Sequence, residues 1–244
     1  MRILVNGACG RMGPTLCRMI EDSAQHTVSA AVDPRGDGVK ILRDFDHAPE
    51  SDVLIDFSHH SAVSALLDYA VAVKLPVLIA TTGHTPEELE CIRRASEQIP
   101  VFYSGNMSVG IALLCSLAKK AATVFPEADI EIVETHHRHK LDAPSGTALM
   151  LAEAVRDARP GASLNVGRQG QGLRPKDEIG IHSLRMGSVV GEHEVRLATG
   201  SQILTLKHQA QDRSLFAEGA LAAASFLAGQ APGLYQMRDM VKGE

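Results

Sequence analysis

Three glycines lie between the first strand-like run and the first helical pattern, and this turn constrains the fold more than any other feature. Ile3-Leu4-Val5 predicts a buried strand, and the residues from about Met12 to Asp22 predict a helix. Between them stand Gly7, Gly10 and Gly13. Such a turn lets the backbone approach a pyrophosphate, and the helix N-terminus supplies N–H donors and a positive dipole end. The start of the sequence therefore predicts a dinucleotide-binding fold.

Strand and helix signals alternate over the first hundred residues. Helical patterns near Ser61–Val73 and Pro86–Gln98 separate the later strand-like runs, and Thr85 is expected to cap the second helix. The strand-like runs are Val28–Val32, Val53–Ile55, Val77–Ile79 and Val101–Tyr103. This alternation is typical of a Rossmann-type, doubly wound parallel sheet with right-handed crossovers.

The pattern changes after Gly110. A helix near Ile111–Val124, a strand at Ile130–Glu134 and a helix near Thr147–Ala158 precede a Gly-, Arg- and Pro-rich loop over residues 159–177. The next three strand-like runs have no helices between them, which favours antiparallel pairing: Ile179–Arg185, Glu194–Ala198 and Ile203–His208. An Ala-rich helix over Leu215–Leu227 is expected to pack back onto the first domain. We therefore predict an α/β protein whose second α+β domain is built on a mixed, largely antiparallel sheet.

Composition excludes several classes of partner. The 244 residues carry 24 Lys and Arg against 29 Asp and Glu, and the net charge of −5 does not favour nucleic acid or an anionic membrane. The four cysteines show no C-x-x-C spacing, which argues against a disulfide framework. The sequence has no signal-peptide pattern and no uncharged stretch near the ~18 residues that span a bilayer. We expect a cytoplasmic protein with no nucleic-acid or membrane partner.

Asp33 stands twenty residues beyond Gly13, at the end of the second predicted strand. An acid at this place can bind the ribose of an adenosine, and it favours NAD over NADP because it repels a 2′-phosphate. Arg35 and Lys40 are close enough in sequence to offset that repulsion. The alternative is a tight turn followed by a surface aspartate with no ligand.

A cationic stretch follows the strand at Ile130–Glu134 and enters the next helix through Pro-Ser-Gly-Thr. Ser145 is placed to cap that helix, and the N–H groups of Gly146 and Thr147 would point at an anion. Crowded cations depress one another's pKa, which would prepare a histidine or Lys140 for proton transfer. The stretch therefore predicts a site for a multiply charged anion, most simply a carboxylate ligand.

Three other interpretations of the cationic stretch compete. His136, His137 and His139 with Asp142 could bind zinc, although they lack helical i, i+4 spacing and a cysteine partner. A basic loop could contact phosphate backbone, although aromatic residues are absent from it. The stretch could also be an ordinary solvated loop.

The run from Glu134 to Ala148, E-T-H-H-R-H-K-L-D-A-P-S-G-T-A, closely resembles the signature of the 4-hydroxy-tetrahydrodipicolinate reductase family, also called dihydrodipicolinate reductase. The resemblance extends to G-x-x-G-R-M-G at the N-terminus, to Thr81-Thr82-Gly83 and to Asn106–Gly110. It thus spans most of the chain. It implies reduction of a cyclic unsaturated dicarboxylate to tetrahydrodipicolinate by NADH or NADPH, in lysine and diaminopimelate biosynthesis. It also implies a homotetramer formed through the second domain's sheet.

The resemblance implies a role for each matching residue. His136 would be a proton donor or acceptor and Lys140 the proton donor, while His137, Gly146 and Thr147 would hold the substrate carboxylates. Contacts to the cofactor would come from Gly7, Ala8, Cys9, Gly10, Arg11, Met12, Asp33, Ala80, Thr81, Thr82, Ser104, Gly105, Asn106 and Met107. No metal is implied. The cofactor-binding domain would cover residues 1–106 with 210–244, and the substrate-binding and oligomerisation domain residues 107–209.

The match has two departures, both on the cofactor side. Ala80 replaces a common glycine, and Ser104-Gly105-Asn106-Met107 replaces Ala-Pro-Asn-Phe, so both differences fall among the residues expected to contact nicotinamide. Two rival functions remain: another two-domain nicotinamide enzyme such as an amino-acid dehydrogenase, and a catalytically silent dinucleotide sensor. The first does not account for His-His-Arg-His-Lys followed by Pro-Ser-Gly-Thr, and intact His136 and Lys140 argue against the second.

Overall fold

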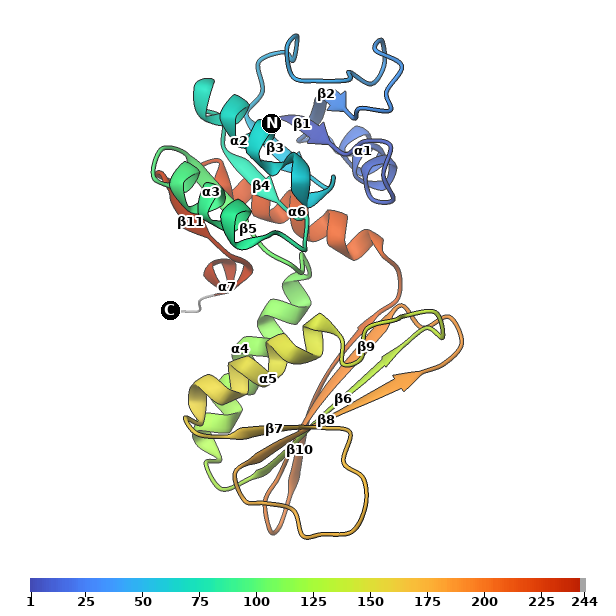
Figure 1. Ribbon diagram of the computed structural model, residues 1–244, viewed down its shortest axis with the longest axis vertical. Coiled ribbons are helices and arrows are strands. Elements are labelled where there is room, and N and C mark those ends of the chain that lie inside the picture. The colour runs from blue at the N-terminus through green and yellow to red at the C-terminus, as the bar shows by residue number, and fades with distance from the viewer. Residues whose placement is uncertain (242–244) are drawn as a thin grey trace. The chain divides into compact units, whose positions relative to one another are not determined.

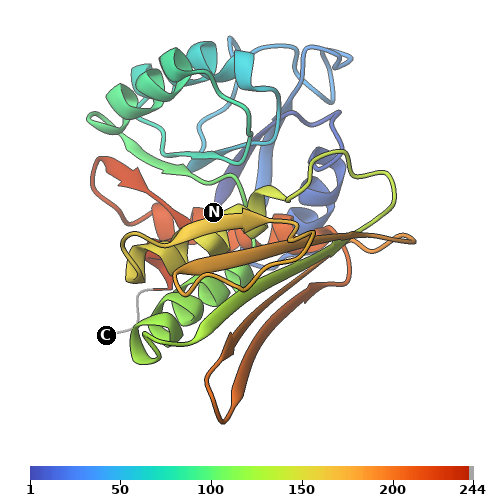
Figure 2. The same ribbon diagram turned by 60° about the horizontal axis from the view of Figure 1, so that its bottom comes forward.

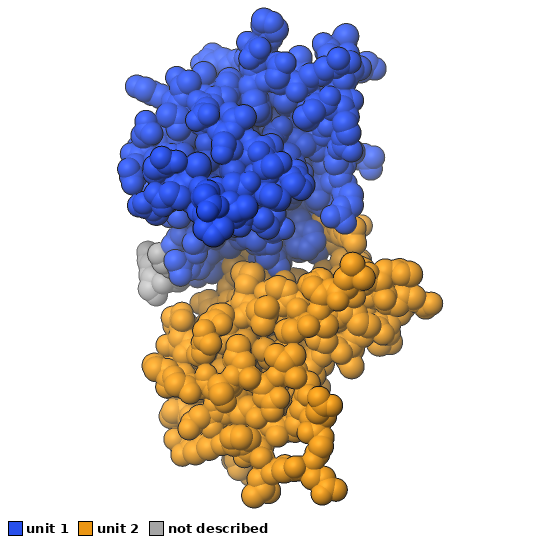
Figure 3. All heavy atoms as spheres, in the orientation of Figure 1, with its two compact units in different colours: residues 1–108, 214–244 blue, residues 109–213 orange. Residues whose placement is uncertain are grey.

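The computed structural model describes residues 1–241. The chain divides into two compact units, coloured separately in Figure 3. The first unit contains residues 1–108 and the C-terminal segment from Ser214, and the second contains Val109–Arg213. The divisions predicted from the sequence lie after residues 106 and 209, and residues 242–244 of that predicted first domain lie outside the described residues.

The first unit is built on a six-stranded parallel sheet with the order β11-β5-β4-β3-β1-β2 (Figure 1). The strands are β1 (Arg2–Asn6), β2 (Thr27–Val32), β3 (Val53–Asp56), β4 (Val77–Ile79), β5 (Pro100–Tyr103) and β11 (Gly233–Tyr235). The prediction of a Rossmann-type parallel sheet is confirmed. The edge strand β11 was not predicted, because three residues of which one is glycine carry no strand periodicity.

Two helical layers cover the sheet of the first unit. The helices are α1 (Gly13–Glu21), α2 (Val63–Ala72) after the 3₁₀ turn His60–Ala62, α3 (Pro86–Ser96), α6 (Ser214–Leu227) and α7 (Met237–Met240). Helix α2 packs against α3, and α1 packs against α6. Successive strand residues point to opposite faces of the sheet and contact different helices. Leu54 and Val101 pack with α2 and α3 on one face, and Phe102 contacts Phe226 of α6 on the other. The predicted return of the last long helix to this domain is confirmed.

The strand order reverses between β1 and β3, which are neighbours in the sheet. Parallel strands carry their carboxyl ends at one edge, and ligands of such sheets bind beside those ends where the order reverses. The glycine turn follows β1, and Phe57 and Ser58 follow β3. Any nucleotide site is therefore expected between these two loops.

The second unit is built on a five-stranded mixed sheet with the order β10-β9-β6-β8-β7, whose long strands are seen in Figure 2. The strands are β6 (Asp129–His136), β7 (Ser163–Val166), β8 (Glu178–Arg185), β9 (Gly191–Ala198) and β10 (Ile203–Ala210). The sheet is mixed, as predicted, but it is not largely antiparallel, because two pairs are antiparallel (β10·β9, β9·β6) and two are parallel (β6·β8, β8·β7).

Two further details of the prediction for the second unit are wrong. The three strands after residue 177 do not all pair antiparallel. Strand β8 lies between β6 and β7 and pairs in parallel with both. Residues 159–177 are not loop throughout, because Ser163–Val166 forms the edge strand β7. A four-residue edge strand with one partner carries too little alternation to stand out in a polar segment.

Helices α4 (Val109–Val124) and α5 (Gly146–Ala158) pack against each other and on the same sheet. Their apolar residues meet one face of the strands, which supplies Ile130, Ile132, Ile179, Ile181 and Val195. The opposite sheet face carries the alternate residues, which are mostly half-buried or exposed. Among the described residues, no helix has the length and apolar character needed to cross a membrane.

Candidate active site

The glycine turn folds back on itself at the carboxyl end of β1. Gly7 has a φ of +81°, and a side chain there would meet the backbone of Phe57 at 2.6 Å. A Cβ at Gly13 would lie 2.5 Å from the carbonyl oxygens of Gly7 and Ala8. The absence of both side chains therefore brings the first turn of α1 against the loop and leaves its N–H groups close to the pocket.

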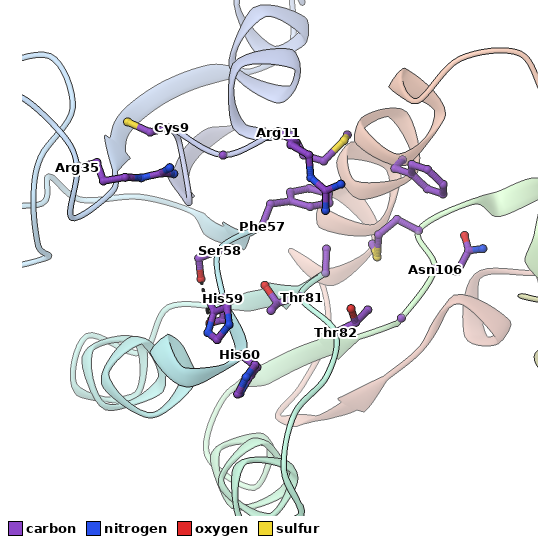
Figure 4. A pocket seen from close by; sticks show the side chains of 16 residues that line it. Cys9, Arg11, Arg35, Phe57, Ser58, His59, His60, Thr81, Thr82 and Asn106 are labelled. Atoms are coloured by element: carbon purple, nitrogen blue, oxygen red, sulfur yellow. Dashed lines mark hydrogen bonds between the residues drawn. The ribbon is translucent and has the colours of Figure 1, made fainter. Parts of the chain in front are cut away.

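Ten of the fourteen predicted cofactor residues line one pocket of about 670 Å³ in the first unit (Figure 4). Cys9 and Arg35 lie at one end of the view, and Thr82 and Asn106 lie at the other. The predicted residues in this lining are Cys9, Gly10, Arg11, Met12, Ala80, Thr81, Thr82, Gly105, Asn106 and Met107. The glycine turn, the loop after β4 and the loop after β5 are thus brought together around one space.

The other four predicted cofactor residues lie outside this lining. The N–H groups of Gly7 and Ala8 donate to the carbonyl of Val32, and the Ser104 hydroxyl donates to the carbonyl of Asn106. Asp33 is buried, and its carboxylate accepts hydrogen bonds from the Cys9 N–H and from the guanidinium and backbone N–H of Arg35. The guanidinium of Arg35 holds the pKa of this carboxyl below its ordinary value.

Five further lining residues were not predicted, four of them after β3 and one in α6: Phe57, Ser58, His59, His60 and Phe216. The loop after β3 had a usable signal, since it follows a predicted strand in a doubly wound sheet. Beneath it, the buried carboxylate of Asp56 accepts hydrogen bonds from Asn6 and Thr81. That carboxylate links the carboxyl ends of three adjacent strands, β1, β3 and β4, beside the pocket.

In the second unit, β6 continues two residues beyond its predicted end and includes His136. Successive side chains of a strand alternate, so Glu134 and His136 lie on the same face as Ile130 and Ile132. That face is covered by α5, and Glu134 is fully buried. The predicted cationic turn therefore begins only at His137, and the first histidine of the signature is a strand residue at the polar end of an apolar face.

Glu134 is the centre of a buried hydrogen-bond network. One carboxylate oxygen accepts from His136 Nδ1 at 2.5 Å and from Arg185 at 2.8 Å. The other accepts from Arg185 at 2.8 Å and from the backbone N–H of Ser145 at 3.1 Å. His193 lies directly across from Glu134 on β9, and its Nε2 is 3.1 Å from the Ser145 hydroxyl.

The network changes the proton affinities of its members. Burial would raise the pKa of the Glu134 carboxyl, but hydrogen bonds from Arg185 and His136 outweigh burial and lower this pKa to about 2. Burial lowers the pKa of His136, and Lys140 and Arg185 lower it further, while Glu134 acts in the opposite direction. Burial, assisted by His136, lowers the pKa of His193 to about 4. Glu134 is thus ionised at neutral pH and His193 is neutral.

The remaining residues of the signature surround this network. Ser145 is the N-cap of α5, and its hydroxyl accepts a hydrogen bond from the Ala148 N–H. Gly146 is exposed and Thr147 is half-buried in the first turn. Lys140 Nζ lies 2.9 Å from Asp142, whose carbonyl accepts from Arg185.

His137 lies elsewhere in the second unit, in a cationic pocket of about 700 Å³. The lining contains His137, Arg138, His139, Gly187, Ser188 and Arg213, and none of the other four predicted catalytic and substrate residues. Arg213, Arg185 and His193 were missed by the sequence analysis. Arg185 and His193 follow His136 by 49 and 57 residues, and Arg213 follows His137 by 76. No local motif therefore connects them with the histidines. Within residues 1–241, no group of three His, Cys, Asp or Glu side chains is arranged to hold a metal ion.

Comparison with known protein families finds matches over nearly the whole chain. The family model described as dihydrodipicolinate reductase, N-terminus, matches residues 1–107, and the model described as dihydrodipicolinate reductase, C-terminus, matches residues 110–241.

Curated proteins named 4-hydroxy-tetrahydrodipicolinate reductase are similar over the same length. The protein of Caldanaerobacter subterraneus subsp. tengcongensis is 44% identical over 99% of this chain and 98% of its own. That of Clostridium novyi is 40% identical over 100% of this chain and 99% of its own. Among solved structures, a dipicolinate-bound dihydrodipicolinate reductase from Paenisporosarcina sp. TG-14 has a TM-score of 0.84 at 23% identity and covers 99% of both chains, which supports the fold.

Proposed function

The chain belongs to the dihydrodipicolinate reductase family, and from that premise we propose that it reduces 4-hydroxy-tetrahydrodipicolinate to tetrahydrodipicolinate. The reductant is NADH or NADPH, and the reaction belongs to lysine and diaminopimelate biosynthesis. The observation that carries the proposal is the buried Glu134–His136–Arg185 network at the N-terminus of α5. The hydrogen bonds of His136 and of the Ser145 N–H to one carboxylate support a proton-transfer group beside a helix end suited to a carboxylate.

The first unit fits a dinucleotide. The positions of Gly7 and Gly13 tolerate no Cβ, so the backbone of the turn stays open to a pyrophosphate. Residues 9–12 with Arg35 would hold the adenosine and pyrophosphate, while Ala80, Thr81, Thr82 and residues 105–107 would hold the nicotinamide half. The separation of Arg35 from Asn106 across the pocket in Figure 4 supports this division. Asp33 would bind the adenosine ribose, and Gly7, Ala8 and Ser104 would support the cofactor contacts from behind the lining.

We propose that both cofactors are accepted, with NADH favoured. The Asp33 carboxylate repels a 2′-phosphate, which favours NADH. Arg35 neutralises that carboxylate and itself lines the pocket, so a cation is available when the phosphate is present. The preference is therefore expected to be small.

In the second unit, His137, Gly146 and Thr147 would hold the two substrate carboxylates. The first turn of α5 offers backbone N–H donors, and the pocket around His137 adds Arg138 and Arg213. Cationic side chains and helix N-termini are the two usual partners of carboxylates. A flat dicarboxylate would thus be fixed at two points.

When bound, the reduced nicotinamide supplies a hydride to the substrate ring, and the 4-hydroxyl group of the substrate is lost as water on the way to tetrahydrodipicolinate. The electron density that then develops must be met by a proton, and Lys140 would donate it from Nζ. His136 would hold or accept a proton at Nε2, since its Nδ1 is engaged by Glu134. Because His136 is buried, water is excluded from around its ring, and the electrostatic interactions of the ring are stronger there than in water.

Two further proposals concern the protein as a whole. The sheet face away from α4 and α5 exposes about half of Leu184 and 68% of Ile203, an apolar surface that association of chains would bury, and this exposure supports a homotetramer. Sedimentation equilibrium should then give four times the chain mass, and a monomer would refute it. We also propose a cytoplasmic location, which the four free cysteines fit.

The function is tested by nicotinamide oxidation with substrate generated in place from pyruvate and aspartate semialdehyde by a synthase. NADH and NADPH are followed in parallel at 340 nm, about the nicotinamide absorbance maximum, with the synthase omitted as control. Synthase-dependent oxidation is expected with both cofactors, faster with NADH. Cofactor binding without oxidation would refute the proposed reaction and favour the silent sensor.

A further inference from the structure

Glu134 is completely buried although it carries a charge, and it is not among the predicted site residues. We infer that Glu134, held by Arg185, is a positioning residue that fixes His136 with Nε2 free of hydrogen and ties it to the N-terminus of α5. This inference rests on the proposed function, because it assumes that His136 takes part in proton transfer. Three contacts carry the argument.

The first contact orients the imidazole ring. An ionised carboxylate only accepts hydrogen bonds, so the 2.5 Å contact between Glu134 and His136 Nδ1 requires the hydrogen to be on Nδ1. The neutral ring then carries a lone pair on Nε2. A side chain at Gly191 would approach Nε2 at 3.1 Å, so a glycine on β9 leaves that nitrogen unobstructed. Glu134 and Gly191 together leave Nε2 of His136 without hydrogen and accessible.

The second contact joins the ring to the helix. The other oxygen of Glu134 accepts from the backbone N–H of Ser145, the N-cap of α5. The same carboxylate therefore holds the proton-transfer ring and the helix end expected to bind a substrate carboxylate. Two groups that act on one substrate are fixed relative to each other through a single side chain.

The third contact reaches the loop that carries Lys140. Arg185 donates to both oxygens of Glu134 and also to the carbonyl of Asp142, and Asp142 pairs with Lys140. The bidentate guanidinium keeps the carboxylate ionised in spite of its burial. Removal of the negative charge would therefore affect His136, the α5 end and the Lys140 loop together.

The charged and titratable groups that face His136 are Glu134 from its own strand, Arg185 from β8, His193 from β9 and Lys140 from the following loop. Only Glu134 favours the protonated ring, and the cations oppose it. Loss of the Glu134 charge should therefore lower the pKa of His136 further.

The tautomer is tested first on the unaltered protein. Nitrogen-15 NMR of histidine-labelled protein at pH 8, about 1.5 above the ordinary histidine pKa, reports which ring nitrogen carries hydrogen. The His136 signals are identified by their loss in His136→Gln. We expect hydrogen on Nδ1, and hydrogen on Nε2 would overturn the inference. This measurement needs neither turnover nor a stable variant of Glu134.

Variants test the effect on catalysis. Glu134→Gln should lower kcat by about 10²-fold or more, as expected when the partner that sets a catalytic tautomer is lost. Glu134→Asp keeps the charge and should retain more activity than Glu134→Gln, although glutamine matches the size of glutamate better. A structural role predicts the reverse order, and that order would refute the inference.

A matched control stands on the same strand. Glu131 lies on the opposite sheet face and also contacts one histidine and one arginine, His182 and Arg174. Glu131→Gln should leave kcat and the pKa of His136 unchanged. Equal losses in both variants would point to damage of β6 and contradict a specific role. If the unaltered protein does not oxidise NADH with substrate, the proposed function fails, and the tautomer result still decides the inference.

Discussion

The two candidate sites are built by opposite means. The pocket of the first unit is formed by loops at the ends of parallel strands, with small residues and backbone N–H groups as its main features. The site of the second unit is formed by charged side chains in strands, buried under a helix. The first site suits a long ligand whose phosphates are bound by backbone N–H groups of the protein. The second site suits proton transfer in surroundings of low dielectric constant.

This difference also determines how each site fails. In the first unit an added methyl group blocks the approach of a ligand or displaces the turn. In the second unit a removed charge leaves buried partners uncompensated, which is costly. Variants in one unit should therefore leave ligand binding in the other unit unchanged.

The largest effect is expected at Lys140. Lys140→Ala removes the proposed proton donor and should lower kcat by about 10²–10⁴-fold, while the Kd for NADH stays unchanged. Stopped-flow turnover and a fluorescence titration measure the two quantities. Lys119→Ala is the control, because Lys119 forms an exposed pair with Asp157. An unchanged kcat in Lys140→Ala would remove this residue from the reaction.

Acid should destabilise the second unit. The pKa of His193 is about 4 in the folded protein and about 6.5 in the unfolded chain, so the unfolded state binds the proton first as pH falls below 6.5. The loss of stability from pH 7 to pH 5 should be about 2 kcal/mol, and it should approach its limit near pH 4. Glu134, with its pKa near 2, adds a further loss only below about pH 4.5.

Hydrogen exchange of the β6 and β8 amides measures this loss within the second unit. Correction for the intrinsic pH dependence of exchange gives the opening free energy at each pH. His193→Gln should reduce the pH dependence between pH 7 and pH 5. An equal dependence with and without His193 would show that another group carries it.

Gly13→Ala should weaken the first unit. The new methyl group would lie 2.5 Å from two carbonyl oxygens, so α1 must shift, at a cost of about 1–3 kcal/mol in stability. The Kd for NADH should rise about tenfold or more, and the KM for the dicarboxylate substrate at saturating NADH should not change. Gly229→Ala is the control, because no atom lies within 4 Å of a Cβ there. Tight NADH binding by Gly13→Ala would contradict the assignment of the pocket.

Asp33→Ala should have the smallest effect. It removes the proposed ribose contact and the repulsion of a 2′-phosphate, so NADH should weaken by about tenfold and NADPH by less. Isothermal titration of both cofactors measures the ratio, with the exposed Asp44→Ala as control. Equal weakening of both cofactors would assign Asp33 only a structural role beside Arg35.

Local signals predicted most elements of both units. The glycine turn, the apolar strand runs and the cap at Thr85, where a full capping box is present, all depend on near neighbours in the chain. The short edge strands β7 and β11 were missed because edge pairing with a distant strand decides them. The lengths of the long helices were predicted within a few residues.

The candidate sites were predictable to different depths. Spacing alone identified the glycine turn, whereas the roles of His136 and Lys140 came from resemblance to a family. Arg185 meets Glu134 across 51 residues, and His193 meets Ser145 across 48, so only the tertiary structure joins them. One local signal was available: Ile130, Ile132, Glu134 and His136 alternate along one strand face, which places the glutamate and histidine together.

The central claim is that the nucleotide held by the first unit reduces a dicarboxylate held by the second. The most direct test is transfer of deuterium to the product from NADH that carries deuterium at both C4 positions, with substrate generated in place and the product analysed by mass spectrometry. One deuterium is expected in tetrahydrodipicolinate with the unaltered protein, and little product is expected with Lys140→Ala. Oxidation of the nicotinamide with no deuterium in the dicarboxylate product would contradict it.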